Sequence, residues 1–180
     1  STWSWHVFHH YLGSIGKFNF ASSATGAFSS GTNTYGAMPT SSVFRVGTTG
    51  NLMPNNTGTD CISYCWHDVE GMQKFGTYVG NGSNDGPFIY TGFRPRLFVQ
   101  KRADSTGDWR VWDSERHSSN PNDAIFRWAT SGAEDTANAS CDFLSNGVKL
   151  RITYTDVNAD GGNYIYMCWG DTPFKYNNTF

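Results

Sequence analysis

Short runs in which apolar and polar residues alternate fill the second half of the chain. Between them lie turn sequences rich in Gly, Asn, Asp, Ser and Pro. A period of two predicts β-strands, and strands at this spacing predict a sandwich or small barrel. We expect an all-β fold, an antiparallel β-sandwich of the jelly-roll or concanavalin-like kind. Only residues 131–139 favour a helical turn. The expected strands are 75–80, 87–93, 96–102, 109–114, 124–128, 147–154 and 163–169.

The chain also repeats itself. Residues 57–72 align with 160–174 at an offset of 103, and residues 4–10 align with 108–114 at an offset of 104. Two blocks at nearly one offset indicate a duplicated unit. We therefore predict about one and two-thirds copies of a tandem repeat, with an incomplete repeat at 1–72 and a complete repeat at 73–180. The matched pairs are Gly58 and Gly161, Ile62 and Ile165, Cys65 and Cys168, Trp66 and Trp169, Trp5 and Trp109, and Val7 and Val111.

The composition favours short strands and narrows the function classes. Of 180 residues, 13 are Lys or Arg and 15 are Asp or Glu, for a net charge of −2, so no basic stripe for nucleic acid is expected. No apolar run is long enough to cross a bilayer, so membrane insertion is not expected. The chain starts inside a strand-like pattern without an initiator Met, which favours a mature product or a piece of a longer protein.

One turn sequence resembles the opening of a calcium loop. Asp156, Asn158 and Asp160 alternate, and a Gly stands at the sixth position. However, Met167 occupies the position of the bidentate Glu, and the earlier repeat has no acidic residue before Asp60. We expect a polar turn without metal or cofactor, and keep Asp156, Asn158 and Asp160 as a weak calcium candidate.

The four cysteines permit more than one arrangement. Cys61 and Cys65 cannot bridge each other within one strand, because four residues span about 13 Å. Cys61, Cys65 and His67 are close in sequence, but their spacing is not that of a zinc knuckle or ribbon. We expect buried thiols at all four cysteines, with two disulfides or a zinc site as alternatives. The other two are Cys141 and Cys168.

Catalytic patterns are weak. Asp113 and Glu115 are expected on one strand face, a spacing that paired-carboxylate glycosidases use. Arg116 beside them favours a solvated ion pair instead. His6, His9 and His10 are expected to be half-exposed strand residues rather than a metal site or general base. No serine or cysteine nucleophile motif occurs. We therefore do not expect an enzyme.

Aromatic residues are candidates for stacking on sugar rings. Because aromatic side chains also fill sandwich cores, Trp5 and Trp109 are expected to be buried. Trp112 and Trp128 are kept as predicted ligand contacts. The wider set of candidates is Trp3, Trp5, Trp109, Trp112, Trp128 and Tyr176.

Residues 74–102, with 142–151 and 158–167, closely resemble a repeated and largely uncharacterised β-domain of tailed-phage structural proteins. That domain is common in marine and cyanobacterial phages. It occurs in tandem in large tail-fibre-like proteins, often beside concanavalin-like lectin domains. In the first repeat, residues 5–13, 40–47 and 69–76 also match its pattern.

The resemblance implies a non-catalytic structural and adhesion module of a virion appendage, a tail fibre or a related part. Such a module builds the fibre and presents loops to the host surface. It would be assembled in the host cytoplasm and exposed extracellularly after release. Its implied partners are other copies of itself, as a homo-oligomer, other virion proteins and a host-surface glycan. A lectin-like carbohydrate-binding module and, less favoured, a glycan depolymerase remain as alternatives.

The first repeat is expected to be incomplete as a folding unit. It lacks a counterpart of residues 75–102, which contain three predicted strands. Open sheet edges and an uncovered apolar face would result. We expect either a longer polypeptide or a neighbouring subunit to supply the missing strands.

Overall fold

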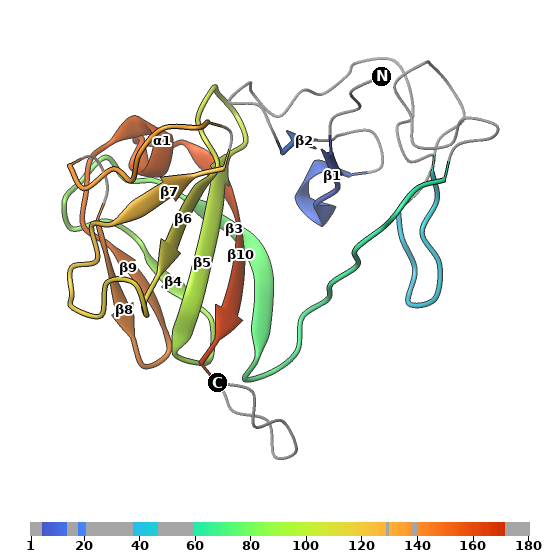
Figure 1. Ribbon diagram of the computed structural model, residues 1–180, viewed down its shortest axis with the longest axis horizontal. Helices are drawn as coiled ribbons and strands as arrows, with labels where there is room; N and C mark the ends of the chain where they lie inside the picture. The colour runs from blue at the N-terminus through green and yellow to red at the C-terminus, as the bar shows by residue number, and fades with distance from the viewer. Residues whose placement is uncertain are drawn as a thin grey trace.

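The computed structural model describes residues 5–13, 18–20, 38–46, 60–128, 130–137 and 140–171. These residues form an all-β fold: a five-stranded and a three-stranded sheet make an antiparallel sandwich, and a two-stranded antiparallel sheet lies in the N-terminal segment. Figure 1 shows the two layers at the left, with the N-terminal segment beside them. No helix in the described residues is long and apolar enough to span a membrane.

The larger sheet has its last strand in its middle. Its order is β3 (Gln73–Val79), β10 (Asn163–Gly170), β5 (Pro95–Arg102), β6 (Arg110–Asp113) and β7 (Ile125–Arg127). All neighbours are antiparallel. Strand β10 is therefore hydrogen-bonded on both edges, whereas β3 and β7 are the edge strands of this sheet.

The smaller sheet forms the second layer of the sandwich. Its order is β4 (Phe88–Tyr90), β9 (Gly147–Leu150) and β8 (Cys141–Leu144). The β8–β9 hairpin turns through Ser145 and Asn146. A single helical turn, α1 (Thr155–Asn158), connects β9 to β10.

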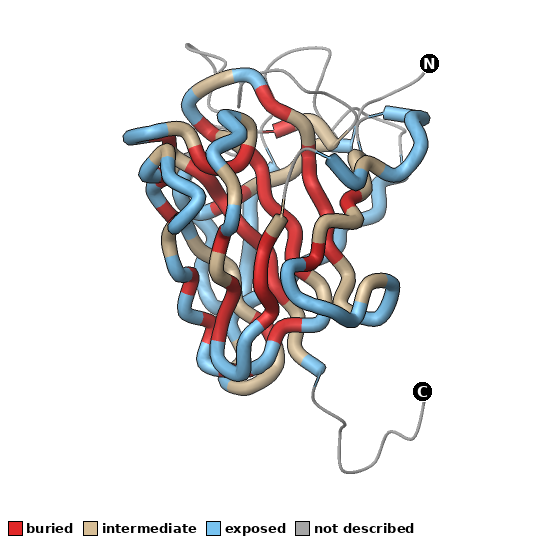
Figure 2. Tube along the Cα trace, turned by 90° about the vertical axis from the view of Figure 1, so that its left-hand side faces the viewer, coloured by how far each residue is buried: buried red, intermediate tan, exposed pale blue. Residues whose placement is uncertain are grey.

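The main core lies between the two sheets. In β10, alternate side chains point to opposite faces: Tyr164, Tyr166 and Cys168 enter this core, while Ile165 and Met167 face outward. Buried positions run along the strands in Figure 2. Because both faces are apolar, β10 is the anchor of the larger sheet. The smaller sheet contributes Ile89, Cys141, Phe143, Val148 and Leu150.

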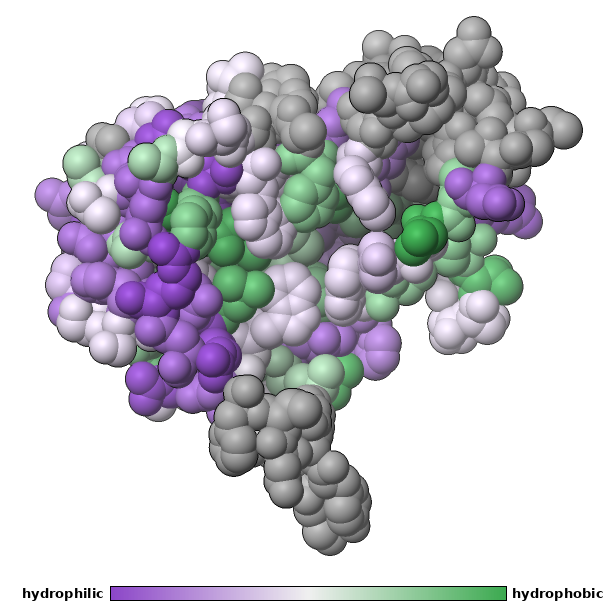
Figure 3. Space-filling model, in the orientation of Figure 1, coloured by the Kyte–Doolittle hydropathy of each residue, from purple (hydrophilic) through white to green (hydrophobic). Residues whose placement is uncertain are grey.

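The outer face of the larger sheet holds a second apolar cluster. Segment β1 (His6–Val7), η1 (His10–Leu12) and β2 (Phe18–Asn19) contributes to it. The Phe18 ring meets the Trp109 ring edge-on at 5.7 Å, and Trp109 Nε1 donates to the carbonyl oxygen of Asn19 at 3.0 Å. In Figure 3, apolar side chains gather between the sandwich and this segment.

The structure confirms the predicted fold class and most of the predicted strands. It adds β8, which the sequence pattern did not indicate. The helical turn expected at 131–139 is wrong for its described part, since residues 131–137 form an irregular loop, and α1 lies instead in the expected turn.

The duplication and its boundary after residue 72 stay predictions. Trp109 is fully buried as expected, but Trp5 is 58% exposed, so these two matched residues occupy different environments. Two candidate aromatics, Trp3 and Tyr176, lie outside the described residues.

Candidate ligand-binding site

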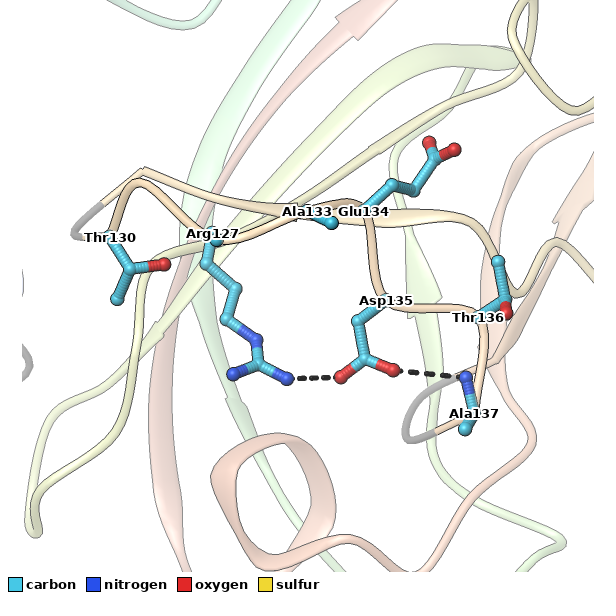
Figure 4. A pocket seen from close by; sticks show the side chains of 8 residues that line it. Arg127, Thr130, Ala133, Glu134, Asp135, Thr136 and Ala137 are labelled. Carbon is cyan, nitrogen blue, oxygen red and sulfur yellow. Dashed lines mark hydrogen bonds and ion pairs between the residues drawn. The ribbon is translucent and has the colours of Figure 1, made fainter.

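An open hollow lies beside the loop that connects β7 to β8. Its volume is about 460 Å³. The hollow is lined mainly by small and polar side chains, as Figure 4 shows. Those with functional groups are Arg127, Thr130, Glu134, Asp135 and Thr136.

The loop is fixed to β7 by its backbone. Asp135 and Ile125 exchange both main-chain hydrogen bonds at 3.0 Å. The Asp135 carboxylate accepts hydrogen bonds from the Arg127 guanidinium and, at 3.0 Å, from the N–H of Ala137. Asp135 thus orders both the floor of the hollow and the turn at its rim. Its hydrogen bond to Arg127 is the main reason that the pKa of this guanidinium is raised.

A network of charges connects the hollow to the interior of the sandwich. Arg127 lies 3.9 Å from Asp108, whose N–H points to the Asp156 carboxylate at 3.4 Å. Asp156 in turn accepts from Arg110 at 3.0 Å. The side chain of Arg110 is 1% exposed, and it also lies over the Tyr154 ring. The position of Arg127 is therefore set by buried groups.

A second hollow, of about 200 Å³, adjoins the first. It shares Thr136 and Ala137 with the first hollow and adds Asp123, Ser140 and Ile152. Hydroxyl and carboxylate groups therefore continue past the rim of the larger hollow. A ligand longer than one small ring has polar partners on both sides of Thr136.

Charge in the larger hollow is balanced. Arg127 pairs with Asp135, and Glu134 pairs with Arg116 at 2.8 Å. Since each cation already has a carboxylate, the arrangement favours a neutral ligand with many hydroxyl groups over a strong anion.

Sequence reasoning did not find this site. Its only signal was the polar run after Trp128, which was interpreted as a helical turn.

The prediction that Trp112 contacts a ligand is wrong. Its side chain is fully buried in the core between the sheets, 5.7 Å from the Phe98 ring. Trp128 is 39% exposed and directly precedes the loop that lines the hollow. One of its faces stacks on Phe20, with ring centroids 4.8 Å apart. Trp128 as a ligand contact stays a prediction.

The carboxylates Asp113 and Glu115 do not lie together on a strand face. Asp113 ends β6, and Glu115 lies in the following turn. The Asp113 carboxylate accepts the N–H of Glu115 at 2.9 Å, and Glu115 lies 3.7 Å from Arg96. The expectation of one strand face is wrong, because the chain turns immediately after Asp113.

The calcium-like sequence is used for hydrogen bonds within the protein. The fully buried Asn158 accepts the N–H of Asn81 at 2.8 Å and donates to the carbonyl oxygens of Ser83 and Ile152 at 2.8 and 2.7 Å. Asp156 binds Arg110, and Asp160 is exposed. Within the described ranges, no group of three or more His, Cys, Asp or Glu is placed to hold a metal ion.

The histidines and cysteines differ from expectation in burial. His9 is 5% exposed and stacks on His10 at 4.4 Å, so it is not a half-exposed strand residue. Burial, and next the nearby His10, lowers the pKa of His9 to about 4. Cys141 and Cys168 are buried as expected, whereas Cys61 and Cys65 are exposed because their segment leaves the sandwich.

Comparison with known families gives one match. The pattern of the family described as domain of unknown function DUF7483 matches residues 1–173. The chain belongs to this family. The DUF7483 match runs through the predicted repeat boundary after residue 72. No curated protein and no solved structure matches the chain.

Proposed function

We propose that this DUF7483 chain is a non-catalytic structural and adhesion module of a phage virion appendage, a tail fibre or a related part. The module uses its sandwich as a spacer and presents the β7–β8 loop to a neutral glycan on the host surface. The similarity of residues 74–102 to a domain of tailed-phage structural proteins supports the location.

One observation carries the binding part of the proposal. A charge-balanced hollow of about 460 Å³ lies beside the β7–β8 loop of the sandwich, and the partly exposed Trp128 follows its lining residue Arg127 in the chain. Sugars need such a combination, because their hydroxyl groups take hydrogen bonds while their C–H faces pack on aromatic rings. Arg127, Glu134 and Thr136 supply donors and acceptors, and Asp135 holds Arg127 in place.

The carboxylates that resembled a glycosidase pair support the non-catalytic part. The Asp113 carboxylate accepts a hydrogen bond from the N–H of Glu115, and the Glu115 carboxylate lies 3.7 Å from the Arg96 guanidinium. Neither arrangement leaves two carboxyl groups on opposite sides of a shared space, which glycoside hydrolysis requires. A depolymerase would need a different pair of residues.

The experiment is a glycan array on the purified chain, followed by calorimetry on each hit. Thr136→Val removes one hydroxyl at nearly constant volume, and we expect binding about five-fold weaker or worse, as for one lost hydrogen bond. Thr77→Val, at an exposed threonine on β3, is the matched control and leaves binding unchanged. An array without hits, or equal losses in both variants, contradicts the adhesion role.

The location is tested separately. Mass spectrometry of purified virions, with antibody labelling in electron micrographs, should find the chain in a tail appendage. Its presence only in infected cells, and not in particles, would contradict the virion part of the proposal.

A further inference from the structure

A β-hairpin begins before β3 and stops after one pair of residues. Val69 and Gln73 exchange main-chain hydrogen bonds at 2.9 and 3.0 Å. At the next position, the Asp68 carboxylate accepts the N–H of Phe75 at 2.8 Å. That N–H is the group that a continuing hairpin strand would use. The preceding segment therefore leaves the edge of β3 and runs away from the sheet (Figure 1).

The segment before this point, Ile62 to Trp66, has the character of a strand without partners. Its apolar side chains alternate, and all are exposed: Ile62 by 73%, Tyr64 by 63% and Trp66 by 54%. None of its backbone N–H or C=O groups has a hydrogen-bond partner in the part of the chain that the structure describes. Unpaired backbone with a row of exposed apolar side chains is an open site for strand addition.

The sequence counterpart of this segment shows the environment that such residues normally occupy. Ile62 and Trp66 align with Ile165 and Trp169 in β10. Strand β10 is paired along both edges, and Ile165 is fully buried. The same pattern is thus buried in one place and exposed in the other. The difference is that no strand among the described residues pairs with Ile62–Trp66.

The sandwich itself offers a matching open edge. Backbone N–H directions alternate along a strand, so Thr77 and Val79, like Phe75, direct theirs away from β10. Both residues are exposed, Val79 by 57%, and their backbone groups on this side have no partner in the described residues. Within its described residues, one chain therefore carries both an unpaired strand-like segment and an unpaired strand edge.

We infer that the segment Ile62–Trp66 of one copy of this chain pairs antiparallel with the β3 edge of a second copy. Pairing of Ile62 and Tyr64 with the Thr77–Val79 edge places their side chains on the outer face of the larger sheet. That face is already apolar and continuous with the segment, since Trp66 meets Trp169 at 6.2 Å and Trp169 meets Phe75 at 5.6 Å. The exchange is reciprocal in a twofold dimer.

The interface is tested with opposite charges on its two sides. Ile62→Lys and Val79→Glu each place one charge in the paired strands, at side chains that are exposed in the single chain and so leave its fold intact. Sedimentation velocity under reducing conditions should show a dimer for the native chain. Each variant alone should raise the dimer dissociation constant about ten-fold or more. The mixture of the two variants should restore a dimer.

Tyr90→Lys is the control, because Tyr90 is 60% exposed on β4, which belongs to the smaller sheet and pairs with β9 rather than with β3. Its dimer should have the native dissociation constant. A native chain that stays monomeric at all concentrations overturns the inference, as does loss of the dimer in Tyr90→Lys. Variants that dimerise as well as the native chain overturn it too. Glycan binding through the β7–β8 loop does not depend on any of these outcomes.

Discussion

Asn158 and Asn81, 77 residues apart in the chain, hydrogen-bond each other in both directions. The N–H of Asn81 donates to Asn158 Oδ1 at 2.8 Å, and Asn158 Nδ2 points to Asn81 Oδ1 at 3.1 Å. Asn158 Nδ2 also lies within hydrogen-bond distance of two carbonyl oxygens. This one buried amide therefore joins the β3–β4 turn to the end of α1.

Asn158→Ala should destabilise the fold by about 2–4 kcal/mol, because it removes a fully buried amide and the hydrogen bonds that it makes to one N–H and two carbonyl oxygens. Urea denaturation followed by tryptophan fluorescence measures this loss. Asn84→Ala, at an exposed position in the same turn, is the control and should change stability little. Equal stability of Asn158→Ala and the native chain would contradict the role of the amide.

Asn158→Asp separates hydrogen bonding from calcium binding. A calcium site gains affinity from an added carboxylate, whereas here the carboxylate would face the carbonyl oxygens of Ser83 and Ile152 without a donor. We expect a lower melting temperature that added calcium does not restore. Calorimetric scans with calcium and with a chelator make the measurement. A calcium-dependent rise in melting temperature would support the metal site instead.

Trp112 and Trp128, the two tryptophans predicted as ligand contacts, should give different results when each is replaced by alanine. Trp112→Ala should cost about 3–5 kcal/mol of stability, because it empties a fully buried site between the sheets. Trp128→Ala should change stability less and weaken glycan binding, because its ring is partly exposed and Trp128 directly follows Arg127, which lines the hollow. Denaturation and calorimetric binding are measured on both variants. Unchanged binding in Trp128→Ala would remove it from the proposed site.

His9 should make the docking of the N-terminal segment sensitive to acid. Its pKa is about 4 in the folded chain, against 6.5 for an ordinary histidine, so the folded state favours the neutral ring. The stabilisation that the neutral His9 ring gives is fully present above pH 6.5. It decreases as the pH drops toward 4 and does not change further below that pH. The full loss is about 3 kcal/mol.

His9→Gln supplies the comparison, since glutamine does not titrate. The stability difference between the native chain and His9→Gln should shift against the native chain between pH 6.5 and 4. Because the carboxylates of the chain titrate in both proteins, only the difference between the two proteins is informative. Parallel pH profiles of the two chains would show that His9 is accessible to protons in the folded state.

The four thiols should fall into two classes. Burial raises the pKa of Cys168 to about 12 and that of Cys141 well above its usual value, so both should resist alkylation in the folded chain. Cys61 and Cys65 are exposed and should react rapidly in dilute protein. Peptide mass spectrometry after brief iodoacetamide treatment identifies the modified residues. Rapid modification of Cys141 or Cys168 would contradict their burial.

Alternation along the chain was enough to predict the strands but not the burial of each side chain. In β10 and β6, residues on both faces are packed, because the larger sheet has a core on each side. A strand of this kind gives no polar face from which to identify the exposed positions. Trp112 was therefore assigned to a ligand, although it belongs to the core.

The candidate site depends on contacts that no local pattern contains. Asp135 pairs with β7 through Ile125 and holds Arg127, and Arg127 reaches Asp108 from another turn. The sequence around Asp135 suggested a helical turn because its backbone pairing with β7 is a tertiary contact. The burial of Asn158 has the same origin, since its partner Asn81 is distant in the chain.

The position of β10 in the middle of the larger sheet restricts the order of events during synthesis. Residues 163–170 separate β3 from β5, so these two strands have no common neighbour until the ribosome has released residue 170. Earlier in translation, the nascent chain carries two apolar strands with a gap between them. Folding of the sandwich therefore awaits its final strand, and premature contacts between nascent chains are most damaging in that interval.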